Sequence, residues 1–191
     1  MTSRTVLLKR ATPLAAALPG AQFGEDHARV LDATPHQVWD ALHAVRWRDL
    51  TFTRPLVRVR LGPSLERESA RMVDVGPGAP IHEDPPRTMS SGFVARPWKP
   101  VPELGPPMPD LDALRAFAEP GWLKVGMEWV LSPVAGGRTL VETTTLCEAT
   151  DDVAQRRFAA YWLVVRPFSG LVRRDLLRVL ARAVRRGPAA A

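Results

Sequence analysis

The stretch from Glu148 to Arg186 constrains the fold more than any other part of the sequence. It reads as one long helix, or two collinear helices, because its apolar residues recur about one turn apart directly after a β-rich region. Thr150 or Asp151 is expected to cap its start by accepting a hydrogen bond from a free amide of the first turn. A sheet must cover the apolar stripe. The residues of the stripe are Val153, Phe158, Trp162, Val165, Leu171, Val172, Leu176, Val179, Leu180 and Val184.

Pro167 and Gly170 divide this stripe into two halves. Pro167 removes a helical hydrogen bond and is expected to mark a kink. The first half carries the aromatic residues Phe158, Tyr161 and Trp162. The second half, with Leu176 and Leu180, is expected to pack as ordinary core.

Strand patterns fill most of the chain before the long helix. The two longest, 122–131 and 138–148, alternate apolar and polar residues, with Gly136 and Gly137 at the turn between them. Shorter strands are expected at 23–32, 70–75, 81–84 and 88–97. Together with the long helix they predict an α+β fold in which a curved antiparallel sheet wraps around the C-terminal helix.

Two short helices are expected after the first strand. The first has the clearest start signal in the chain: Thr34 is the cap, Pro35 occupies the first helical position, and Gln37 can bond back to the cap. The second is expected at 53–62. The proline-rich segment 99–110 predicts a surface loop, and 111–118 predicts one or two helical turns.

A length of 191 residues suits one domain. The predicted organisation is an irregular N-terminal segment at 1–22, a single domain at 23–186 and a tail at 187–191. No apolar stretch is long enough to span a membrane. Lys9, Arg10 and Pro13 interrupt what would otherwise resemble a secretion signal, so we expect a cytoplasmic protein. Cys147, the only cysteine, is expected to be a small buried side chain.

The formal net charge is +6, and much of the excess comes from arginines near the C-terminus. Four of them recur at helical spacing: Arg174, Arg178, Arg182 and Arg185. Such a stripe either binds an anionic partner or is the solvated back of an amphipathic helix, and we favour the second interpretation. Nucleic acid is not expected as a partner, because no row of aromatic residues accompanies the arginines.

Three segments together resemble the START-like, or SRPBCC, superfamily, whose fold is called the helix-grip. They are A-T-P-H-Q-V-W-D-A-L at 33–42, E-P-G-W-L-K at 119–124, and A-T-D-D-V-A-Q-R-R-F-A-A-Y-W at 149–162 followed by R-P-F-S-G-L-V-R-R at 166–174. The last two are similar to an uncharacterised bacterial, polyketide cyclase-like subgroup. That subgroup leads us to expect a T-E-T-R-like run in the last strand. Here the run is Thr143, Thr144, Thr145 and Leu146, so the charged pair is absent.

The resemblance implies an internal cavity between the sheet and the long helix that holds a lipid, polyketide or aromatic metabolite. The first half of the helix, before Pro167, is expected to close this cavity. Inward-facing apolar and aromatic residues either line such a cavity or fill a core, and the pattern does not distinguish the two. The candidate lining residues are Met89, Phe93, Trp98, Val125, Met127, Trp129, Tyr161, Trp162 and Val165.

Some relatives cyclise or dehydrate their ligand, so an enzyme of polyketide cyclase or aromatase type is the alternative function. His82 and Glu83 are candidates for acid–base work, and Tyr161 and Arg166 for polarising a carbonyl group. His82 and Glu83 equally fit a polar strand end, and Arg166 fits a cap at the helix break before Pro167.

Glu128 and Glu142 are predicted to face each other across the hairpin. They form either a carboxylate pair or part of an exposed, salt-bridged surface with Lys124, and we favour the second interpretation. No zinc-binding, dinucleotide-binding, P-loop or serine-nucleophile motif occurs, so neither a metal nor a cofactor is expected.

Overall fold

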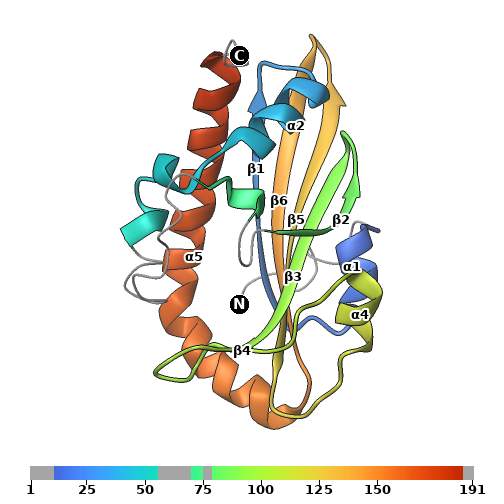
Figure 1. Cartoon of the computed structure of the whole chain (residues 1–191), viewed down its shortest axis with the longest axis vertical. Coiled ribbons are helices and arrows are strands. Elements are labelled where there is room, and N and C mark those ends of the chain that lie inside the picture. Colours follow the sequence, from blue (N-terminus) through green and yellow to red (C-terminus); the bar gives the residue numbers. More distant parts are fainter. Residues whose placement is uncertain (1–10, 56–69, 75–78, 187–191) are drawn as a thin grey trace.

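The computed structural model describes residues 11–55, 70–74 and 79–186 (Figure 1). An open six-stranded antiparallel sheet curves along a single long helix. The elements in chain order are α1 (Pro13–Ala17), β1 (Phe23–Leu31), α2 (Pro35–Ala44), the 3-10 turns η1 (Trp47–Asp49) and η2 (Met72–Asp74), β2 (Pro80–Asp84), β3 (Thr88–Arg96), β4 (Glu103–Leu104), α4 (Leu111–Ala116), β5 (Leu123–Val134), β6 (Arg138–Ala149) and α5 (Asp152–Arg186).

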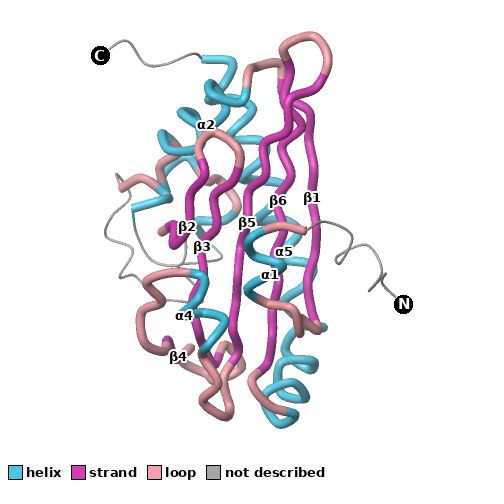
Figure 2. Tube along the Cα trace, turned by 90° about the vertical axis from the view of Figure 1, so that its right-hand side faces the viewer, coloured by secondary structure: helices cyan, strands magenta, loops and turns pink. Residues whose placement is uncertain are grey.

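The sheet order is β1-β6-β5-β3-β2, and β4 pairs with β3. The long helix α5 lies along one side of the sheet, which we call the helix-facing side (Figure 1). The short helices α1 and α4 lie on the opposite, far side (Figure 2). The predicted α+β class, the curved antiparallel sheet and the long C-terminal helix are therefore confirmed.

The starts of α2 and α5 are capped by side chains, as the sequence predicts, and of the two candidates at α5 Asp151 is the cap. At α2, the Gln37 amide donates to Thr34 Oγ1, and the Thr34 amide donates to Gln37 Oε1. At α5, Asp151 accepts from the amides of Ala154 at 2.7 Å and Gly121 at 2.6 Å. These bonds, the Ala154 amide first, lower the pKa of the Asp151 carboxyl. Asp151 therefore ties the start of α5 to the entrance of β5.

Two apolar clusters cover the two ends of the helix-facing side. The upper cluster joins α2, the C-terminal half of α5 and the upper strand ends, and it includes Trp129, Leu176 and Leu180. The lower cluster is built on Leu123, Cys147 and Phe158. The prediction that the second half of α5 packs as core is confirmed.

The N-terminal segment predicted to be irregular contains α1. Thr12 caps it by accepting from the Ala15 amide at 3.2 Å. Leu14 and Leu18 are then buried against the far side of β5 at Gly126, in a third cluster together with α4. The sequence prediction was wrong here because a five-residue helix has little periodicity and takes its stability from the sheet.

The predicted exposed face around Glu128 is also wrong. Glu128 is 1% exposed and accepts from the Leu14 amide at 3.0 Å and from Ser90 Oγ at 3.1 Å. Lys124 pairs instead with Glu148 at 2.6 Å, and Glu148 also accepts from the Gly20 amide. The docking of α1 is the physical reason, because it brings backbone donors to carboxylates that would otherwise face water.

No carboxylate pair forms across the hairpin either. Glu128 stands opposite Thr144, while Glu142 stands opposite Val130. The register therefore offsets the two carboxylates by two residues along the strands, so they are not direct neighbours.

Two further predicted segments and the predicted kink at Pro167 compare with the structure as follows. The strand expected at 70–75 is η2 with an isolated bridge between Arg71 and Arg46, as far as it is described. The helix expected at 53–62 lies mostly outside the described residues. Helix α5 stays continuous through Pro167, and its two halves run at an angle to each other (Figure 1).

Replacing Gly126 by alanine tests the docking of α1. The new Cβ would collide with Leu14 Cδ1 and lie 3.0 Å from Leu18 Cδ1, and both leucines are fully buried. We expect the free energy of unfolding to fall by about 1–3 kcal/mol, measured by urea denaturation. In a Leu14→Ala background the same substitution should cost much less, and equal costs in both backgrounds would contradict the packing described.

Candidate functional site

Strand register places the inward-facing residues of four strands in rows across the helix-facing side. One row is Ser91, Met127, Thr145 and Glu25, on β3, β5, β6 and β1. The next row towards the upper end is Met89, Trp129, Thr143 and His27. The first row lies between the two apolar clusters, and the second borders the upper cluster, to which Met89 and Trp129 belong. Both rows carry polar side chains. We call the following residues the central belt: Glu25, His27, Ser91, Thr143, Thr145, Ser169 and Arg173.

Arg173 enters the belt from α5 and is 5% exposed. Its Nη1 donates to Thr143 Oγ1 at 3.3 Å, and its Nη2 donates to Thr145 Oγ1 at 2.6 Å. Burial lowers the pKa of the guanidinium to about 10, against the opposing effect of the nearby Glu25 carboxylate. Within the described part of the chain, no carboxylate oxygen lies within 4.0 Å of Arg173, so hydroxyl groups alone bond this buried charge.

Glu25 and His27 approach from β1, where α5 passes closely over the sheet. The Ser169 hydroxyl donates to Glu25 Oε1, and His27 Nε2 lies 3.8 Å from Glu25 Oε2. A Cβ added at Gly170 would lie 3.8 Å from the His27 ring. His27 Nε2 is buried and has no hydrogen-bond partner among the described residues. It is therefore free to accept from or donate to a molecule placed beside it.

Three apolar side chains at the centre of the helix-facing side are less buried than their neighbours along the strands. On the central strand β5, Leu123 and Trp129 are buried, whereas Val125 and Met127 between them are partly exposed. Phe93, opposite Val125, is also partly exposed. In a sheet filled by its own side chains the middle of a central strand is normally its most buried part. On β5 this order is reversed, because Val125 and Met127 in the middle are more exposed than Leu123 and Trp129 on either side.

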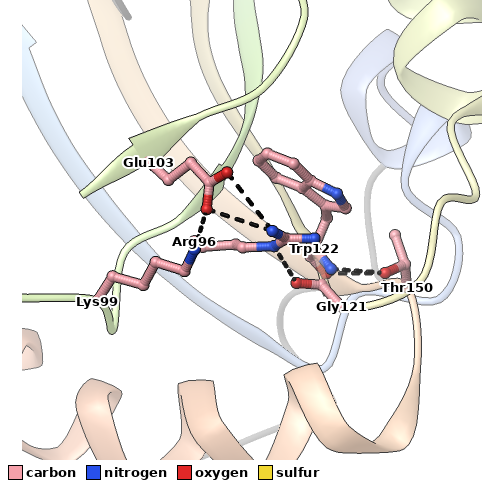
Figure 3. A network of polar contacts seen from close by, with 6 residues as sticks. All are labelled: Arg96, Lys99, Glu103, Gly121, Trp122 and Thr150. Atoms are coloured by element: carbon pink, nitrogen blue, oxygen red, sulfur yellow. Dashed lines mark hydrogen bonds and ion pairs between the residues drawn. The ribbon is translucent and has the colours of Figure 1, made fainter. Parts of the chain in front are cut away.

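A polar network fixes the lower end of the sheet (Figure 3). The Arg96 guanidinium stacks on the Trp122 ring at 4.0 Å and donates to the Gly121 carbonyl and the Glu103 carboxylate. Lys99 also pairs with Glu103, and its hydrogen bond lowers the pKa of that carboxyl. The network holds both ends of the turn that carries Trp98, whose buried Nε1 has no partner in the described residues.

The four polar residues predicted as catalytic candidates do not converge. His82 pairs with Ser90 and so lies on the far side of the sheet, while the exposed Glu83 contacts His43 Nε2 at 2.8 Å. The reason is topological, since β2 is the edge strand opposite β1. Arg166 is exposed on α5, and Tyr161 is partly buried at the margin of the lower cluster.

The nine predicted lining residues fall into three groups. Met89 and Trp129 are buried in the upper cluster. Trp98, Tyr161 and Trp162 pack at the margin of the lower cluster. The remaining four, all partly exposed, are Phe93, Val125, Met127 and Val165. Phe93 and Met127 belong to none of the apolar clusters formed by the described residues.

Sequence reasoning missed Arg173, Glu25 and His27. The signals were present, because Arg173 precedes Leu176 and Leu180 by three and seven positions and therefore shares their helix face. Glu25 and His27 lie an even number of positions from Phe23 and Leu31, so on a strand they share the face of these apolar residues. Charged residues on an apolar stripe are the feature to look for.

Neither a metal site nor a membrane span is found in the described residues. No group of three or more His, Cys, Asp or Glu side chains there is placed to hold a metal ion. None of the described helices is long and apolar enough to cross a membrane.

Comparisons with known proteins give distant structural neighbours. No family model matches the chain, and no curated protein matches it. A conserved protein from Geobacillus kaustophilus is similar with 15% identity and a TM-score of 0.42, over 86% of this chain and 96% of the other. A protein from Thermus thermophilus is similar with 12% identity and a TM-score of 0.31, over 85% and 97%. Neither likeness carries an argument about function.

Cys147 should be unreactive in the folded protein. Burial, with a smaller contribution from Glu25, raises the pKa of its thiol from 9.0 to about 12. At pH 8 we expect a disulfide reagent such as DTNB to react at least about a hundredfold more slowly with folded than with urea-unfolded protein. Because the folded pKa is raised, the associated stability is present below pH 9.0 and is lost as the pH rises towards 12. Equal reaction rates in both states would contradict this burial.

Proposed function

We propose that the chain is a START-like protein that binds a small hydrophobic molecule between α5 and the helix-facing side of the sheet. The molecule has an apolar body, such as that of a lipid, polyketide or aromatic metabolite. It also carries an oxygen acceptor, a carbonyl or carboxylate, that meets Arg173.

The reversed exposure on the sheet is the observation that carries the proposal. Phe93, Val125 and Met127 face α5 from the middle of the sheet and are partly exposed. Leu123 and Trp129, which face the same side before and after them on β5, are buried. Leaving apolar surface uncovered at the centre of a fold costs stability, at about 25 cal/mol per Å². A bound apolar molecule would recover that free energy.

The burial of Arg173 is the reason for proposing an oxygen acceptor on the ligand. Moving a charge from water into a protein interior costs several kcal/mol unless hydrogen bonds and an opposite charge compensate, so such groups commonly serve a function. Thr143 and Thr145 supply hydroxyl oxygens only. A carbonyl or carboxylate placed beside the guanidinium would add a charge-assisted hydrogen bond.

The element order supports assignment to the START-like superfamily. The described chain runs from a first strand and a capped short helix, through antiparallel strands, to one long C-terminal helix. This is the order that the resemblance implies. The segment at 33–42 forms the start of α2, and the segment at 149–162 forms the start of α5.

Binding of cis-parinaric acid, a fluorescent fatty acid, tests the proposal. We expect saturable binding by the wild-type protein. Arg173→Met should weaken it about tenfold to a hundredfold, because a charged hydrogen bond is worth about 1.5–3 kcal/mol. Arg174→Met is the matched control, since Arg174 is the exposed neighbour on the same helix.

The methyl ester of the same fatty acid separates the two parts of the ligand. It should bind wild type and Arg173→Met more nearly alike, because it lacks the carboxylate. Met127→Ala should weaken both probes. Absence of saturable binding to either probe would overturn the proposal. Equal loss in Arg173→Met and Arg174→Met would overturn the role given to Arg173.

A polyketide cyclase-like enzyme is the second candidate, and the unpartnered His27 Nε2 is the observation that favours it. In that version His27 takes a proton through Nε2 from the carbon beside a carbonyl group, the Glu25 carboxylate at 3.8 Å stabilises the imidazolium that forms, and Arg173 stabilises the charge on the oxygen. The residues differ from those the sequence predicted.

Incubation with a linear polyketide thioester, followed by mass spectrometry, tests this second candidate. Conversion to a cyclised, dehydrated product by wild type, lost in His27→Gln, is the expected result. His27→Gln should still bind cis-parinaric acid, which separates chemistry from binding. Unchanged turnover in His27→Gln would remove His27 as the base.

A further inference from the structure

Helix α5 presents a row of exposed apolar side chains on the face turned away from the sheet. Leu163 is 79% exposed and Val164 66%, and Phe168 and Leu171 are each nearly half exposed. Their spacing places all four on one side of the helix. Single exposed apolar residues are common on protein surfaces, but four neighbours on one helix face indicate an interaction surface. We call these four residues the outward row.

Exposed arginines stand at both ends of the outward row. Arg156 and Arg157 precede it by about two turns, and Arg174 and Arg178 follow it on the same side of the helix. The sequence has no acidic residue from 153 to 174. The next one, Asp175, is buried and accepts from the Thr53 amide at 2.9 Å. Asp151 and the exposed Asp152 lie about one turn before Arg156, and after the hydrogen bond from the Ala154 amide the charge of Arg156 also helps to lower the pKa of Asp151. The face therefore has an apolar centre, a partly compensated N-terminal end and a positive C-terminal end.

This charge pattern argues against a second copy of the chain as the occupant. A two-fold contact through the outward row would bring Arg156 and Arg157 of one copy close to Arg174 of the other, or each group onto itself. Between positions 153 and 174 no acidic side chain is available to pair with them, and the exposed Asp152 already lies one turn from Arg156 of its own copy. Like charges brought together in this way oppose association.

The apolar centre argues for a lipid surface over a nucleic acid. A polyanion would satisfy the arginines but leave Leu163, Val164 and Leu171 in water or against phosphates. A helix with an apolar strip and flanking basic residues fits a bilayer interface, where apolar side chains enter the acyl boundary and arginines meet anionic headgroups. Leu163 and Val164 are well exposed, so the row can meet a flat surface.

We propose that the outward row of α5 and its flanking arginines form a docking surface for a membrane containing anionic phospholipids. Because α5 lies along the outside of the sheet, the helix can lie parallel to the membrane plane without unfolding (Figures 1 and 2). Docking needs no bound ligand, so this inference stands independently of the proposed function.

Vesicle flotation tests the docking surface. Vesicles of phosphatidylcholine mixed with phosphatidylglycerol should carry the wild-type protein, and vesicles of phosphatidylcholine alone should carry much less. Added salt should weaken the binding, because screening reduces the attraction of arginines to headgroups. Replacing both Arg156 and Arg157 by glutamine should weaken it at least about fivefold.

The apolar part of the surface needs its own variants. The double variant Leu163→Ser, Val164→Ser should lose at least about tenfold in partitioning to anionic vesicles. The matched control is Val101→Ser, Leu104→Ser, which removes two exposed apolar side chains from a different surface and should bind as wild type. All these positions are exposed, so thermal unfolding should be unchanged, and Leu171→Ser provides a second probe of the row.

Four results would overturn the proposal. The first is absence of flotation with anionic vesicles, and the second is full binding by the Leu163, Val164 double variant. The third is a wild-type dimer in solution that this variant abolishes, which would assign the row to a second copy. The fourth is loss of vesicle binding to competing nucleic acid while the apolar variants keep nucleic-acid binding, which would assign the arginines to a polyanion.

Discussion

The buried guanidinium of Arg173 fixes how α5 lies on the sheet. A charge placed there must find acceptors, and the two it has are hydroxyls on β6, so the helix is held at one position along that strand. The Ser169 hydroxyl makes a second polar tie one turn earlier, to Glu25 on β1. Near these two contacts, the charged groups of Arg173 and Glu25 and the imidazole of His27 lie together beneath α5. The apolar clusters above and below determine only that α5 covers the sheet, whereas the belt determines where.

The far side of the sheet is organised by two carboxylates. Glu128 receives the first turn of α1, and Glu148 receives the backbone at Gly20 just beyond it. Gly126 leaves the space into which Leu14 and Leu18 pack. The sheet is therefore covered on both sides at its lower end, and the two carboxylates on the far side bind backbone amides of the chain itself. This leaves the helix-facing side as the place for the ligand that we propose.

Local signals made much of the fold predictable. Thr34, Pro35 and Gln37 are neighbours in sequence, so the capping box that they form could be read directly, as could the turn at Gly136 and Gly137, whose φ values of 79° and 67° suit glycine. The site depended on distant partners. The Leu14 amide meets Glu128 across 114 positions, and Ser169 meets Glu25 across 144. Periodicity shows which side of an element is buried, but it does not show which polar group on another element will lie opposite.

The sheet-facing and outward faces of α5 belong to one continuous helix. Gly170 and Arg173 lie over the sheet, while Leu171 and Arg174, each only one residue further along, point away from it. A helix of this kind is stiff over a few turns, so these faces cannot move independently. A tilt of α5 about any point away from Arg173, made when its outward face meets another body, changes the distance from Arg173 to Thr145. The position of α5 therefore affects both the central belt beneath the helix and the outward row on its other face.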